Sequence, residues 1–149
     1  MERLRRFLRL TTLERWLFVK VFLLLEFVRL GLWLLPFRTL LRLLSRVSEG
    51  PKEPSSTDRP SPEEIAWSVE VASRHSPGVK TCLTQALAAQ VLLTRHGYPA
   101  FVHLGVLRGK QEQFQAHAWV ESEGRIVVGG EDLERYAPLG ILEQELPTR

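Results

Sequence analysis

The chain has 149 residues, of which 44% are hydrophobic and 25% are charged, with 20 Lys and Arg residues against 17 Asp and Glu. This length suits one domain with a substantial core and is too short for two large ones. The basic excess is confined to residues 1–50, which carry 10 basic and 4 acidic side chains, whereas residues 51–149 carry 10 and 13. A uniformly basic surface that binds nucleic acid is therefore a poor interpretation of this composition.

Cys82 is the one cysteine of the chain, which excludes an intramolecular disulfide framework and a cysteine-rich zinc site. A lone thiol suits a reducing cytoplasm, where it is either an inert small apolar residue or a nucleophile. The role of Cys82 therefore decides what kind of protein this is.

Residues 1–48 are rich in Leu, Phe, Trp and Arg and predict helices. Between Trp16 and Leu35, 16 of 20 residues are apolar, which is long enough to span a bilayer. Each apolar residue favours insertion by roughly 0.3–0.6 kcal/mol, but each of three charges opposes it by about 2.5–3.5 kcal/mol. The terms nearly cancel, so we expect a buried or surface-lying helix and not a transmembrane one.

A second helix is predicted to open with Pro36 at its first position. Arg38, Arg42 and Arg46 repeat in it at four-residue spacing, opposite an apolar face. The simplest interpretation is a solvated basic face. Contact with acidic lipid headgroups, or with an acidic partner peptide, is the alternative.

Residues 49–61 are rich in proline and serine and predict a linker, and residues 62–149 then form the main domain. Ser61 and Glu64 form a capping box for a helix over 62–75. Thr81 is placed to cap a second helix over 82–96, which ends at Gly97. The linker thus separates an N-terminal helical region from a domain that opens with two helices.

Three segments of alternating apolar and polar residues follow, over 100–107, 115–121 and 125–128. They predict an antiparallel β-meander, which makes the fold class α+β. In the second segment His117, Trp119 and Glu121 share one face of the strand, because successive side chains point to opposite faces.

Cys82 stands where a loop turns into a helix, so the free N–H groups and the dipole of the first turn favour a thiolate and can hold an oxyanion. His117 is the candidate general base, and His103 on the neighbouring strand is the alternative base. Asp132 is the candidate acid that orients the histidine, with Glu131 as its alternative. Both follow the third strand.

Four motifs in this order resemble one family: TCLTQAL at 81–87, GYP at 97–99, HAWVE at 117–121 and GRIVVGG at 124–130. The sequence is similar here to the transglutaminase-like B2 proteins of lasso-peptide biosynthesis. The similarity covers roughly residues 62–139, and the N-terminal block resembles that family's helical extension. It implies a transglutaminase-like or papain-like core, in which the helix bearing the cysteine packs on the antiparallel meander.

The resemblance implies a cysteine peptidase that removes the leader from a ribosomally made precursor before an ATP-dependent cyclase closes the macrolactam ring. By this similarity Cys82 is the nucleophile and His117 the base, and a leader-binding protein presents the precursor. The family often has an Asp near the position of Gly129 and Gly130, so the acidic role would shift to Asp132 or Glu131, or be absent. The chemistry requires no cofactor, metal or nucleic acid and suits a cytoplasmic enzyme.

Two other functions remain open on the sequence. An acyl transferase would use the same cysteine and histidine, with an amine replacing water in the second step. A non-catalytic adaptor of a peptide-maturation complex would tolerate Cys82→Ser in every assay, whereas a peptidase would lose leader cleavage and still bind precursor. Peripheral membrane association through residues 1–48 also remains open.

Overall fold

A computed structural model describes residues 11–50, 59–75, 82–107, 115–131 and 133–142. The helices in these ranges are α2 (Thr12–Leu34), α3 (Phe37–Ser48), α4 (Pro62–His75) and α5 (Cys82–Arg95). The strands are β1 (Phe101–Leu107), β2 (Ala116–Ser122), β3 (Arg125–Val128) and β4 (Tyr136–Leu142), the last preceded by a short 3₁₀ turn, η1 (Leu133–Arg135). The predicted α+β class is confirmed.

The helix ends follow local sequence signals. At the start of α4 the Ser61 amide donates to Glu64 Oε2 at 2.8 Å, and the Glu64 amide donates to Ser61 Oγ at 3.2 Å, so the predicted capping box is formed. The predicted stop at Gly97 is also confirmed, since this glycine adopts a φ of +84° just after α5. Pro36 precedes the first residue of α3, one position earlier than predicted. The predicted cap Thr81 lies outside the described residues.

The strands form one antiparallel sheet in the order β3-β2-β1-β4. The meander of β1, β2 and β3 is as predicted, but β4 is an additional strand that pairs with the other side of β1. Pro138 and Gly140 disfavour a strand in a sequence-based prediction. An edge strand accommodates them because one side of its backbone has no ladder to complete.

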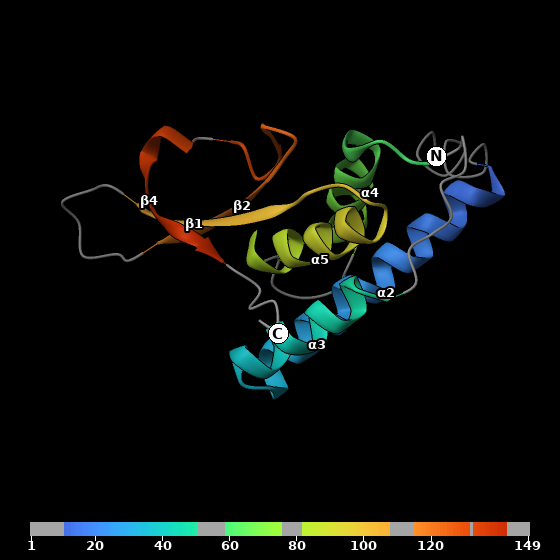
Figure 1. Ribbon diagram of the computed structural model, residues 1–149, viewed down its shortest axis with the longest axis horizontal. Coiled ribbons are helices and arrows are strands. Elements are labelled where there is room, and N and C mark those ends of the chain that lie inside the picture. The colour runs from blue at the N-terminus through green and yellow to red at the C-terminus, as the bar shows by residue number, and fades with distance from the viewer. Residues whose placement is uncertain (1–10, 51–58, 76–81, 108–114, 132, 143–149) are drawn as a thin grey trace.

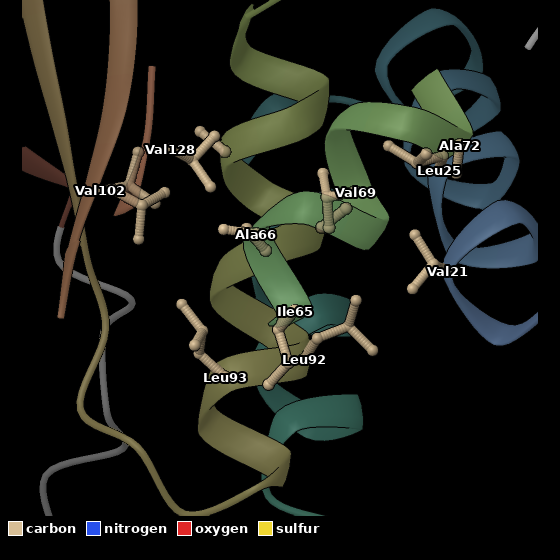
Figure 2. Packing of buried hydrophobic residues seen from close by; sticks show 14 of the residues in the cluster. Val21, Leu25, Ile65, Ala66, Val69, Ala72, Leu92, Leu93, Val102 and Val128 are labelled. Carbon is tan, nitrogen blue, oxygen red and sulfur yellow. The ribbon is translucent and has the colours of Figure 1, made fainter. Parts of the chain in front are cut away.

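The molecule is layered, with the sheet on one side, α5 against it, and α4 and α2 beyond (Figure 1). Figure 2 shows the core between these layers, with Val102 and Val128 of the sheet facing α5 and Ile65 of α4 packed nearby. Val21 and Leu25 of α2 belong to the same cluster. The N-terminal region therefore shares one hydrophobic core with the helices and strands that follow residue 62.

The helix α2 lies on the protein, with one face buried against α4 and α5. Among the described residues, none of the helices has the length and apolarity needed to cross a membrane.

The shared core gives a stability prediction for α2. Leu25→Ala should lower the free energy of unfolding by about 2–5 kcal/mol, since this side chain is buried and its loss leaves a cavity. Leu23→Ala on the solvent-facing side of the same helix should change it by less than about 0.5 kcal/mol. Denaturant unfolding followed by circular dichroism measures both. Equal effects would contradict the placement of α2 against the core.

Candidate active site

Cys82 is the first residue of α5, the central helix of the molecule. Nine of the 14 residues of α5 are buried, so the helix is held between the sheet, α4 and the pair α2 and α3. The Cys82 side chain is half-buried, and its Sγ lies 3.9 Å from the carbonyl oxygen of Ala116 in β2. The fold thus fixes the sulfur against the beginning of the second strand.

His117 follows Ala116 directly in the chain, so the fold brings Cys82 next to the strand segment that carries this histidine. Ala118 and Val120 face the helices and are buried in the core, whereas the pleat directs His117 to the other face of β2. There the imidazole stacks on the Tyr136 ring, with 4.8 Å between centroids. The predicted division of β2 into two faces is confirmed.

The His117 ring is oriented by the main chain. Its Nε2 lies 2.8 Å from the carbonyl oxygen of Gly129, just after β3. A carbonyl oxygen only accepts, so Nε2 carries the hydrogen of this bond. In the neutral ring Nδ1 is then the unprotonated nitrogen, as a general base requires.

The Cys82 sulfur and Gly129, whose carbonyl binds the His117 ring, lie along the same edge of β2. Alternate carbonyls of a strand point to the same side, so those of Ala116 and Ala118 share a direction. Cys82 Sγ lies beside the first carbonyl, and a Cβ on Gly129 would stand 2.7 Å from the second. The thiol hydrogen is directed at Ala116 and not at the imidazole. The thiol's printed contact is thus with the main chain of β2, one residue before His117.

Gly129 is required by this geometry. Its φ is +74°, and an added Cβ would collide with the backbone of β2. The sequence does signal a turn here, through the pair of glycines after β3. It does not reveal that a carbonyl within the turn orients a histidine 12 positions earlier.

Of the two predicted orienting acids, the described residues include only Glu131. Glu131 is exposed, and the Nε2 of His117 is bonded to the Gly129 carbonyl instead. Asp132 lies outside the described residues, and its role stays a prediction. Gly129 therefore offers a backbone acceptor where the resembled family often has a carboxylate.

His103, the alternative base, is engaged elsewhere on the same face of the sheet. Its ring stacks on Trp119 at 5.6 Å, and Nε2 lies 3.1 Å from Glu121 Oε2, within ion-pair distance but outside hydrogen-bond geometry. Gly105 leaves room for Trp119, since a Cβ there would come within 2.8 Å of the indole. These contacts favour His117 over His103 as the partner of Cys82.

A matched pair of glycine-to-alanine substitutions separates the cost of a positive φ from the cost of the steric clash that a Cβ on Gly129 would make with β2. Gly124→Ala, at φ +77° with open space around the new Cβ, should lower the free energy of unfolding by about 1–2 kcal/mol. Gly129→Ala should cost about 1–3 kcal/mol more, because the Cβ meets the Ala118 carbonyl. Urea denaturation of both variants provides the measurement. An equal loss would show that the turn relaxes without moving β2.

The arrangement has the parts of a nucleophile–base pair: a thiol at a helix N-terminus and an imidazole in a fixed tautomer on the adjacent strand. Cys82 is the first residue of α5, and the free amides of a helix's first turn can stabilise a developing oxyanion. In the described part of the chain, His, Cys, Asp and Glu nowhere gather in a group of three or more that could hold a metal ion.

Comparison with known proteins agrees with this architecture. The family model of the transglutaminase-like superfamily core matches residues 23–140, from within α2 to within β4. No curated protein and no solved structure matches the chain. The matched segment covers most of the chain and includes both Cys82 and His117, and enzymes built on a cysteine and a histidine are typical of the superfamily. The chain therefore belongs to the transglutaminase-like superfamily.

Proposed function

We propose that this protein is a cysteine peptidase that removes the leader peptide from a lasso-peptide precursor before the macrolactam ring is closed. The observation that carries the proposal is the position of Cys82 Sγ, 3.9 Å from the carbonyl of the residue that precedes His117. The orientation of His117 by Gly129 supports it, because the tautomer leaves Nδ1 free to take a proton. The superfamily match supports the type of chemistry, and the motifs shared with B2 proteins support the substrate.

In the proposed mechanism His117 Nδ1 takes the proton of the Cys82 thiol, and the thiolate attacks the carbonyl carbon at the leader–core junction. The backbone amide of Cys82 helps to hold the oxyanion of the tetrahedral intermediate. Protonated His117 then gives its proton to the departing amine of the core peptide. Water, deprotonated by His117, hydrolyses the thioester, which releases the leader with a free carboxylate and restores the thiol.

The first step requires the thiol to turn from the Ala116 carbonyl toward His117. A change of rotamer about the Cα–Cβ bond of Cys82 redirects Sγ without moving α5. Catalytic hydrogen bonds are often long or poorly aligned before substrate binds and shorten in the reactive complex. A precursor strand that occupies the edge of β2 near Ala116 would compete for this carbonyl and favour the turn.

The experiment is reconstitution from purified parts. The full chain is incubated with the precursor and the leader-binding protein, without cyclase or ATP, and the products are read by mass spectrometry. We expect two fragments whose masses add up to the precursor plus one water. Intact precursor, under conditions in which its binding is demonstrated, would contradict the proposal.

The same assay separates hydrolysis from acyl transfer. In heavy-oxygen water a peptidase places the label in the new carboxylate of the leader. An acyl transferase given a small primary amine instead forms the leader amide, which has a different mass. Predominant amide formation at a modest amine concentration would favour the transferase.

A further inference from the structure

The solvent-facing side of α2 is apolar over most of its length. Six of its exposed side chains recur every three or four residues and fall within about 80° of the helix circumference, at 100° per residue. These residues, here called the outer stripe, are Trp16, Val19, Leu23, Phe27, Leu30 and Leu34. The buried side chains Val21, Leu25 and Val28 lie on the opposite face. One helix thus has two apolar faces, of which the protein covers one.

The outer stripe continues through the turn between α2 and α3. Trp33 and Leu34 remain 81% and 66% exposed, and Leu35 and Phe37 are exposed after them. Large exposed apolar side chains gathered on one helix face and the adjoining turn are typical of a binding surface.

The helix α3, which follows this surface in the chain, carries exposed basic side chains. Arg38, Arg42 and Arg46 are exposed on the side of α3 opposite its buried residues Leu40 and Leu44. The sequence of residues 1–10, MERLRRFLRL, adds four arginines among leucines and a phenylalanine immediately before α2. The charge of residues 1–50 is +6 (10 minus 4), whereas that of residues 51–149 is −3 (10 minus 13). Along the sequence, the N-terminal third that contains α2 and α3 is therefore basic and the remainder is acidic.

We propose that the outer stripe and the arginines of α3 dock the protein on an anionic lipid surface, with α2 lying in the plane of the interface. A face of Trp, Phe and Leu accompanied by arginines is the composition of interfacial helices, whose rings and aliphatic chains enter the headgroup region while the guanidinium groups contact phosphates. The charge asymmetry favours an anionic lipid surface as the partner, because such a surface attracts the basic residues of the N-terminal third and repels the acidic remainder of the chain.

This docking leaves the candidate active site accessible. The helices α2 and α3 lie on the side of α5 away from the sheet, whereas the site lies where α5 meets β2 (Figure 1). The inference does not depend on the peptidase proposal, and its test needs no substrate.

The test is flotation of the full chain with vesicles of phosphatidylcholine, alone or mixed with phosphatidylglycerol. We expect the protein to float with the mixed vesicles at low salt, to be released by high salt, and to bind weakly to phosphatidylcholine alone. Leu34→Ser should weaken binding about tenfold. Leu139→Ser in β4 is the matched control, since Leu139 is also 66% exposed but lies on the sheet, and it should leave binding unchanged.

Removing charge should act separately from removing apolar surface. Each of Arg38→Gln and Arg42→Gln should weaken binding to the mixed vesicles about fivefold. Circular dichroism confirms that the variants are folded. Failure of the wild type to float would overturn the proposal, as would equal losses for Leu34→Ser and Leu139→Ser. The wild type could instead bind neither kind of vesicle and sediment as a dimer. If Leu34→Ser dissociated that dimer, the outer stripe would be assigned to self-association.

Discussion

Cys82→Ala is expected to abolish leader cleavage, with a loss in kcat of about 10⁴–10⁶-fold, the size seen when the nucleophile of a hydrolase is removed. The thiolate forms the covalent bond of the acyl intermediate, and no other side chain at the N-terminus of α5 can replace it, since this is the chain's one cysteine. The rate is measured under single-turnover conditions by the mass of the released leader. Precursor binding should remain, because the substitution removes a single sulfur atom from a half-buried position.

Because Cys82 is the one cysteine of the chain, alkylation gives an independent measurement on the wild-type protein. An alkylating reagent that reacts with thiols can modify Cys82 alone, so inactivation should parallel the appearance of one adduct per chain. Addition of precursor with its leader-binding protein should slow the modification. Normal cleavage by Cys82→Ala, or by fully alkylated protein, would contradict the peptidase and leave the adaptor as the better hypothesis.

The elements that carry the candidate site were predictable because their signals are local. The capping box at Ser61 and Glu64, the stop at Gly97 and the alternation around His117 each depend on a few neighbouring residues. The pairing of Cys82 with His117 was predicted from residue types at a helix start and on a strand and was supported by the resemblance, since spacing along the chain does not tell how a helix packs on a strand. The packing of α5 on the inner face of the sheet supplies this relation.

The missed features are those that long-range pairing decides. The edge strand β4 contains Pro138 and Gly140, and only its pairing with β1 makes that segment a strand. That pairing also brings Tyr136 onto the His117 ring. The Gly129 carbonyl that orients His117 is a main-chain acceptor, and such acceptors exist at every residue and leave no mark in a sequence.

For α2, too, long-range packing decides a feature that the sequence does not reveal. Its composition predicted a helix, and among the described residues no helix has the length and apolarity to cross a membrane. Apolar residues occupy most of its circumference, so periodicity alone could not tell which side faces the core. The packing of Val21 and Leu25 against α4 and α5 resolves this, and it leaves the outer stripe exposed.

His117→Gln is expected to lower kcat for leader cleavage by about 10³-fold or more, with little change in precursor binding. The glutamine amide can still donate a hydrogen bond to the Gly129 carbonyl, so the substitution preserves much of the local contact. It cannot take the thiol proton or return it to the leaving amine. The variant therefore tests proton transfer more directly than alanine would, and single-turnover cleavage measures it.

His103→Gln is the matched control, because both histidines lie on the same face of the sheet on either side of Trp119. Their ring centroids stand 6.1 Å (His117) and 5.6 Å (His103) from the Trp119 ring. The register pairs His103 with Trp119 itself and places it beside Glu121, away from Ala116 and the sulfur. We expect His103→Gln to retain kcat within a few fold. A loss comparable to that of His117→Gln would show that the stacked rings of His103, Trp119 and His117 support catalysis together, and not His117 Nδ1 alone. Full activity of both variants would remove the general base from the mechanism.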